Sequence, residues 1–260
     1  MISILLLDDT YGKQHDDIVD DVFVMFIAGS KTVQTTTTNF ITHLLHRPDL
    51  KERLDAELNP MLEKCKENFM QLMTTEVIED LEYLKMFYNE VLRYDTPIPT
   101  SSTTCFSKDV NINGINFKEG DPVLLCMSEM HRSEKEWIEP DTFNPDRFDP
   151  NSKYYKRPDG SNRNPLVFNP FLGGKRVCLG KTFAETTLKL TLPLFIHHFD
   201  FEFVKEEQKE VRPHYEIGGT NMIEIPINFI TKNKVKQNFK QTQKQEPDSA
   251  PATTTTQPVE

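Results

Sequence analysis

A long segment without proline, residues 16–46, is the feature that most constrains the fold. Its apolar residues recur every three or four positions: Ile18, Val22, Met25, Phe26, Phe40, Leu44 and Leu45. This spacing predicts one long helix, because such side chains share a helix face. Poor helix formers gather at its middle, namely Gly29, Ser30, Thr32 and residues 35–38. The helix could bend or open there, or Gly29 could let another backbone pack closely.

Three further segments have helical spacing, residues 48–62, 75–94 and 179–199. We predict that Thr75 caps the second and that Thr96-Pro97 ends it. Pro193 should kink or shorten the last turns of the third.

The rest of the chain predicts small sheets and coil. Residues 110–126 alternate around an Asn113-Gly114 turn, which indicates a small hairpin sheet. Residues 137–177 are rich in Pro, Asn, Asp and Gly and predict a long ordered coil, which is usually functional. Short strands should follow at 201–204 and 222–229. The fold class is therefore mainly α with small β-sheets, in one domain over residues 1–232, with a disordered polar tail over 233–260.

Composition excludes some functions. The net charge is -10, which argues against nucleic-acid binding, because phosphate contacts need clustered Lys and Arg. The four cysteines, Cys65, Cys105, Cys126 and Cys178, form neither a CxxC pair nor a disulfide framework, which favours a reduced, intracellular setting. The apolar residues 1–7 are too few for a membrane span and lack a basic signal-peptide region, so we expect no membrane segment in this chain.

The strongest motif surrounds Cys178, in the sequence Phe-Leu-Gly-Gly-Lys-Arg-Val-Cys-Leu-Gly between the coil and a helix. A helix N-terminus favours the thiolate that a metal needs, and glycines let a flat cofactor come close. A lone cysteine is more often a small buried hydrophobe. However, Phe171, Gly174, Arg176, Cys178 and Gly180 would coincide by chance on the order of one time in ten thousand. Arg176 could pair with a cofactor carboxylate, and Phe171 could pack beside the sulfur.

This pattern resembles the cysteine loop of the cytochrome P450 family. Three further segments match in the family's order. Glu90-Val91-Leu92-Arg93 resembles the Glu-x-x-Arg of the K helix, and residues 143–148 resemble the segment that supplies a second arginine, Arg147. Residues 28–32 resemble the oxygen-binding groove of the I helix.

The resemblance implies roles for these residues. Glu90, Arg93 and Arg147 would form a buried charge network behind the cysteine loop, whose loss should prevent haem incorporation. For an isolated Glu and Arg three residues apart, the alternative is a solvated surface pair. In the I helix, Ala28 and Gly29 would line the oxygen groove and Thr32 would help deliver protons through water.

The sequence departs from the family pattern at several positions. Lys31 replaces the usual acid and Val33 a common hydroxyl residue, which bears on proton delivery. Thr103-Thr104 lie where many members have an arginine that binds a haem propionate. His131-Arg132 could replace that anchor or could equally form a surface loop.

By resemblance, the chain is the C-terminal portion of the cytochrome P450 fold, truncated at its N-terminus, with the I helix, cysteine loop and L helix. Cys178 would be the axial ligand of the iron of haem b, iron protoporphyrin. The implied function is a haem-thiolate monooxygenase that inserts one atom of O2 into a small apolar substrate and takes electrons from an NADPH-dependent reductase or another partner.

Further expectations concern partners, substrate and alternatives. Lys175, Arg176 and Lys181 could form the docking face for the electron donor, or could be ordinary surface charges. Substrate contacts would come from residues 24–36, 98–103 and 218–221. The full-length protein would lie at the endoplasmic reticulum membrane if it is a eukaryotic microsomal member. Two alternatives remain: a truncated, non-enzymatic haem-binding remnant, and a haem-thiolate peroxide isomerase.

Overall fold

The computed structural model describes residues 15–64, 74–205, 207 and 226–232. The helices are α2 (His15–His46), α3 (Pro48–Lys64), α5 (Thr75–Glu79), α6 (Glu82–Tyr94), α7 (Met127–His131) and α8 (Lys181–His198). Single turns of 3-10 helix occur at η1 (Pro145–Phe148), η2 (Lys153–Tyr155), η3 (Pro165–Val167) and η4 (Gly174–Arg176). The strands are β1 (Thr104–Cys105), β2 (Val110–Ile112), β3 (Ile115–Phe117), β4 (Pro122–Val123), β5 (Phe199–Phe203) and β6 (Ile227–Thr231).

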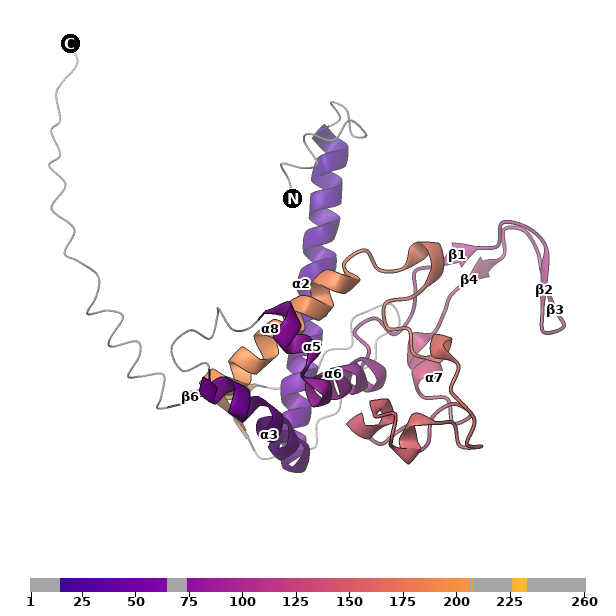
Figure 1. Cartoon of the computed structure of the whole chain (residues 1–260). Coiled ribbons are helices and arrows are strands. Elements are labelled where there is room, and N and C mark those ends of the chain that lie inside the picture. Colours follow the sequence, from indigo (N-terminus) through magenta and orange to yellow (C-terminus); the bar gives the residue numbers. More distant parts are fainter. Residues whose placement is uncertain (1–14, 65–73, 206, 208–225, 233–260) are drawn as a thin grey trace, which may run out of the picture.

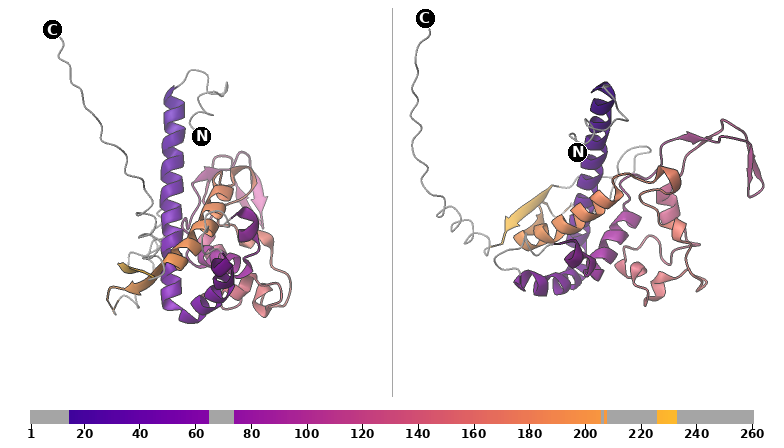
Figure 2. Two further views of the ribbon diagram at one scale, coloured as in Figure 1. Left: turned by 60° about the vertical axis from the view of Figure 1, so that its left-hand side comes forward. Right: turned by 45° about the horizontal axis from the view of Figure 1, so that its top comes forward.

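Helix α2 is a long helix that runs upright through the view of Figure 1. Its C-terminal half packs against α3, α6 and α8, and α6 lies between α2 and the coil that carries η1 and η2 (Figure 2). The main core lies at this crossing and includes Phe40, Leu54, Phe87 and Leu192, all fully buried. The N-terminal half of α2 projects beyond the other described helices.

The sheets are small. Strands β1 and β4, β2 and β3, and β5 and β6 form three antiparallel pairs. The β2–β3 hairpin turns at Asn113 and Gly114, both with positive φ, as the Asn-Gly pair predicts. The mainly α fold with small sheets is confirmed, and the long coil over 137–177 is present with only η1–η4 inside it. The predicted tail and the first half of the predicted strand over 222–229 lie outside the described residues, whereas residues 227–229 belong to β6.

Helix α2 stays continuous through its threonine-rich middle. The hydroxyls of Thr32, Thr35 and Thr36 each donate to the carbonyl oxygen four residues earlier, at distances of 2.7, 2.9 and 3.0 Å. These bonds satisfy the hydroxyls without a break in the helix. Among the described residues no heavy atom lies within 4 Å of a Cβ built at Gly29, so the alternative of close backbone packing there is wrong for this part of the chain.

Two helix boundaries differ from the sequence prediction. Residues 75–94 form two helices, and the cap of the first is Thr74, whose hydroxyl accepts from the Val77 amide, rather than Thr75. The second helix begins where the Glu57 carboxylate of α3 accepts from the amides of Tyr83 and Leu84, at 2.7 and 2.9 Å. Pro193 does not shorten α8, which continues to His198. No helix in the described part of the chain is both long and apolar enough to cross a membrane.

Candidate functional site

The segment from Asn169 to Gly180, here called the cysteine loop, is a folded turn immediately before α8. The Leu172 amide donates to the Asn169 carbonyl oxygen and the Cys178 amide to that of Phe171, both at 2.9 Å. Leu172 and Gly174 both have positive φ, +59° and +63°. Glycine adopts this conformation freely, whereas leucine is strained in it. The local geometry therefore requires Gly174 more clearly than Gly180, whose φ is -84°.

Cys178 is a free, exposed cysteine two residues before the α8 N-cap, Gly180. A Cβ added at Gly180 would lie 4.0 Å from the sulfur, an ordinary van der Waals contact. Apolar side chains around the sulfur are also exposed: Val177 by 47%, Leu179 by 87% and Phe183 by 69%. An open sulfur with exposed apolar neighbours is a surface that a flat apolar cofactor could cover.

The other residues of the motif divide between core and surface. Phe171 is partly buried and packs against the main core, so it anchors the loop. The Lys181 ammonium lies 5.9 Å from its ring centroid. Arg176 is exposed and makes no hydrogen bond or ion pair with any described residue. Its guanidinium is available to an anionic partner.

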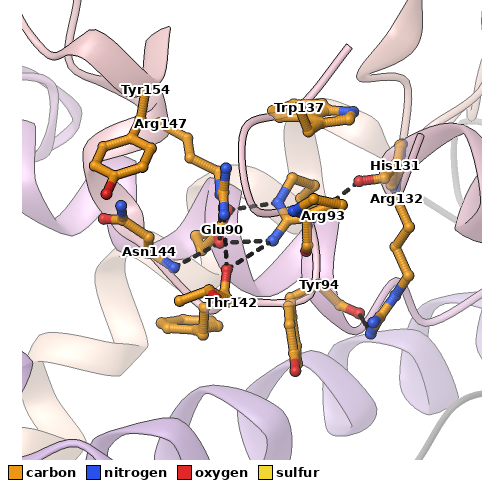
Figure 3. Close-up of polar contacts among 12 residues, drawn as sticks. Glu90, Arg93, Tyr94, His131, Arg132, Trp137, Thr142, Asn144, Arg147 and Tyr154 are labelled. Carbon is orange, nitrogen blue, oxygen red and sulfur yellow. Dashed lines mark hydrogen bonds and ion pairs between the residues drawn. The ribbon is translucent and has the colours of Figure 1, made fainter. Parts of the chain in front are cut away.

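Glu90, Arg93 and Arg147 meet between α6 and the coil that carries η1, and all three are fully buried (Figure 3). Arg93 binds the Glu90 carboxylate through two nitrogens, Nε at 2.7 Å and Nη2 at 2.8 Å, and Arg147 Nε lies 3.3 Å from Glu90 Oε1. The surface-pair alternative is therefore wrong for Glu90 and Arg93.

The network carries two guanidinium charges and one carboxylate. Backbone carbonyls supply the remaining acceptors: Arg93 donates to those of His131, Pro140 and Thr142, and Arg147 to those of Ile138, Glu139 and Thr142. These carbonyls fix the coil between α7 and η1, because buried guanidinium groups require satisfied donors. Burial lowers the pKa of Arg147, and the Glu90 carboxylate opposes that shift.

Several partners in this network were not predicted from the sequence. The Asn144 amide donates to Glu90 Oε1 at 2.7 Å. Trp137 is fully buried, and the guanidinium carbons of Arg163 and Arg93 lie 3.8 Å and 5.3 Å from its ring centroid. Arg163 also donates to the carbonyls of Glu136, Tyr154 and Tyr155. Burial lowers the pKa of Arg163 to about 10, so it remains charged at neutral pH. Most of these partners are main-chain atoms, which leave no side-chain pattern to find.

His131 faces the protein interior, whereas Arg132 is half-buried. His131 is fully buried, so the surface-loop alternative is wrong for it. Burial, together with the Arg93 charge, lowers the pKa of His131 to about 3, so the ring is neutral. Arg132 donates to the Tyr94 carbonyl at 2.8 Å and to Asp141 at 2.9 Å. Both contacts tie this arginine to α6 and the coil rather than to the cysteine loop.

The candidate oxygen groove lies on the projecting half of α2. Thr32 is partly buried, Gly29 is half-buried, and Ala28 and Lys31 are exposed. Large apolar residues around them are exposed by 50 to 72%: Val19, Phe23, Val24, Phe26 and Ile27. Helices α2 and α8 are in contact, but within the described residues no hydrogen bond joins Thr32 to the cysteine loop. The structure thus brings the charge network together, whereas no hydrogen bond among the described residues joins Thr32 to the cysteine loop.

The family model described as Cytochrome P450 matches residues 1–229. The chain belongs to the cytochrome P450 family. Cytochrome P450 3A6 of Oryctolagus cuniculus is 35% identical over 199 residues, which cover 75% of this chain and 37% of the relative. Probable cytochrome P450 6a21 of Drosophila melanogaster is 32% identical over 189 residues, which cover 72% of this chain and 35% of the relative.

The fold of this P450 chain also matches a solved structure. Retinoic acid-bound cyanobacterial CYP120A1 superposes with a TM-score of 0.68 at 24% identity, over 83% of this chain and 46% of that one. The chain therefore has part of the P450 fold, and it spans a little over a third of the curated relatives named above.

Proposed function

We propose that Cys178 is the axial thiolate ligand of a haem b iron and that this chain supplies the ligand side of a haem-thiolate monooxygenase. The observation that carries the proposal is the open Cys178 sulfur on a folded loop. The Cys178 amide is held at Phe171, and a buried network fixes the coil that leads into the loop.

The residues around Cys178 fit haem. The exposed side chains of Val177, Leu179 and Phe183 offer apolar contact to the ring. Arg176, exposed and without a protein partner in the described chain, would pair with a propionate. No group of three or more His, Cys, Asp or Glu among the described residues could hold a metal by itself. A single thiolate suits a metal whose remaining ligands come from a cofactor.

When bound, haem with a thiolate ligand supplies O2 activation and the insertion of one oxygen atom into an organic substrate. The chain's own residues would orient the substrate and deliver protons. The Thr32 hydroxyl donates to the Ala28 carbonyl at 2.7 Å, so its oxygen keeps lone pairs that can accept from water. Thr32 would thus hold a water that passes protons into the groove.

The exposed surfaces point to the substrate class and the electron donor. The apolar face of α2, which includes Phe23, Phe26 and Ile27, together with Ile98 favours a small apolar organic substrate. Lys175, Arg176 and Lys181 are exposed around the loop on a chain of net charge -10. They would attract an acidic reductase partner.

The test is haem uptake by the 260-residue chain, with Cys178→Ser and Cys105→Ser as a matched pair, because both cysteines are free and exposed. We expect the wild type and C105S to bind haem and to give the red-shifted Soret band of a thiolate ligand when reduced with carbon monoxide. C178S should lose that band. No uptake by the wild type, or the same band in C178S, would refute the proposal.

A further inference from the structure

His131 lies between the charge network and the cysteine loop and contacts both. It is the last residue of α7 and is fully buried. Its carbonyl oxygen accepts from Arg93 Nη1 at 2.9 Å. Its ring Nε2 accepts from the Asn169 amide at 3.3 Å. One residue therefore joins the buried arginine to the first residue of the loop.

Main-chain hydrogen bonds connect Asn169 with the rest of the loop as far as Cys178. The Asn169 carbonyl accepts from the Leu172 amide, and the Phe171 carbonyl accepts from the Cys178 amide. The path from Glu90 through Arg93, His131 and Asn169 to the loop thus contains no exposed side-chain link.

The imidazole is suited to this position in its neutral form. An imidazolium donates from both nitrogens and could not accept from the Asn169 amide. With Nε2 as acceptor, the proton lies on Nδ1, as the hydrogen-bond pattern assigns it. Nδ1 has no hydrogen-bond partner among the described residues, so the Nε2 contact with Asn169 is the link from the ring to the loop.

Packing fixes the ring in place. Its centroid lies 5.5 Å from that of Phe168, which in turn lies 4.9 Å from Phe148 and 6.3 Å from the buried Trp137. Phe168 immediately precedes Asn169, so the same aromatic cluster holds the entry to the loop.

We propose that His131 is a positioning residue that holds the cysteine loop, and through it Cys178, by accepting the Asn169 amide hydrogen at Nε2. This proposal rests on the proposed function, because the loop position matters to catalysis only if Cys178 ligates the iron. The contact itself is independent of haem.

The test compares His131→Phe, which keeps a ring without an acceptor, with His131→Gln, whose amide oxygen can take the place of Nε2. Amide hydrogen exchange at Asn169 and Cys178 is measured by NMR on the full haem-free chain. We expect H131F to speed exchange at Asn169 by about tenfold, and H131Q to stay within about threefold of the wild type. Tyr94→Phe is the control, because it removes another hydrogen bond between α6 and the coil, from the Tyr94 hydroxyl to the Asp141 carbonyl. It should leave the amide exchange rate of Asn169 unchanged.

A second readout is the spectrum after haem addition. H131F should give a smaller thiolate-type Soret fraction than H131Q at equal haem content. Equal Asn169 exchange in H131F and the wild type, or equal acceleration in H131F and H131Q, would overturn the proposal. If H131F does not fold, His131→Asn takes its place, because its shorter side chain cannot reach the Nε2 position. Failure of haem uptake by the wild type would count against the proposed function alone, and the exchange result would still decide the role of His131.

Discussion

Replacement of Glu90 by glutamine is the sharpest test of the charge network. The carboxylate accepts four hydrogen bonds, two from Arg93, one from Arg147 and one from the Asn144 amide. Glutamine removes the single negative charge and turns an N-H donor toward at least one guanidinium donor. Arg93 and Arg147 would remain fully buried without a counter-charge. Breaking such a buried pair typically costs about 3–5 kcal/mol, and we expect E90Q to lose that much of its free energy of unfolding.

Urea unfolding followed by circular dichroism measures this loss. The control is Asp146→Asn, which breaks an ion pair of similar length, Arg53 to Asp146 at 2.7 Å, with side chains 46% and 33% exposed. An exposed pair contributes about 0.2–1 kcal/mol, so D146N should change little. Adding Arg147→Met to E90Q should cost less than R147M alone, because it removes one uncompensated charge. A loss below about 1.5 kcal/mol in E90Q, or an equal loss in D146N, would refute the electrostatic reasoning.

Three further perturbations test other parts of the structure. Gly174→Ala should lower the free energy of unfolding in urea by about 1–2 kcal/mol, because φ at Gly174 is +63°. Gly29→Ala, in the open middle of α2, should raise the free energy of unfolding by about 0.5–1 kcal/mol. The same sign for both changes would contradict this reasoning. Glu57→Gln should cost about 0.5–1 kcal/mol, since both carboxylate oxygens cap α6, and Glu63→Gln on the exposed face of α3 is the comparison. His131 has a folded-state pKa of about 3 against an ordinary 6.5, so the unfolded chain binds the extra proton and stability falls as the pH drops below 6.5. Between pH 7 and 5 the wild type should lose about 2 kcal/mol more than H131Q, and parallel pH profiles would contradict the buried neutral ring.

The sequence predicted those parts of the fold whose cause is local. The apolar spacing of residues 16–46 and 179–199 located α2 and α8, and Asn113-Gly114 located the β2–β3 turn. The break between α5 and α6 was missed because neither Gly nor Pro marks it. Its cause is the carboxylate of Glu57, which lies 26 residues away in the sequence and caps the new helix. Boundaries set by tertiary contacts leave no local pattern.

The same division applies to the candidate site. Five residues at fixed offsets pointed to the cysteine loop, and the pattern around Glu90 and Arg93 pointed to the network that the structure brings together. The burial of His131 and the stacking of Arg163 on Trp137 could not be predicted, because their partners are main-chain atoms and rings brought together by an irregular coil. Such a coil has no periodicity from which to infer a neighbour.

The two sides of the candidate site depend on different parts of the structure. In the proposed arrangement, Cys178 would be held by buried groups on α6, α7 and the coil, which are linked by the Arg93–His131 and Asn169–His131 hydrogen bonds. The groove on α2 instead has exposed apolar neighbours, such as Phe26 at 72%. A substitution in the buried support should therefore change the thiolate spectrum and the stability of the loop, while one at Thr32 should leave both unchanged and alter proton delivery alone. If the proposed function holds, we therefore expect ligation of the iron and enclosure of the substrate to respond to different substitutions.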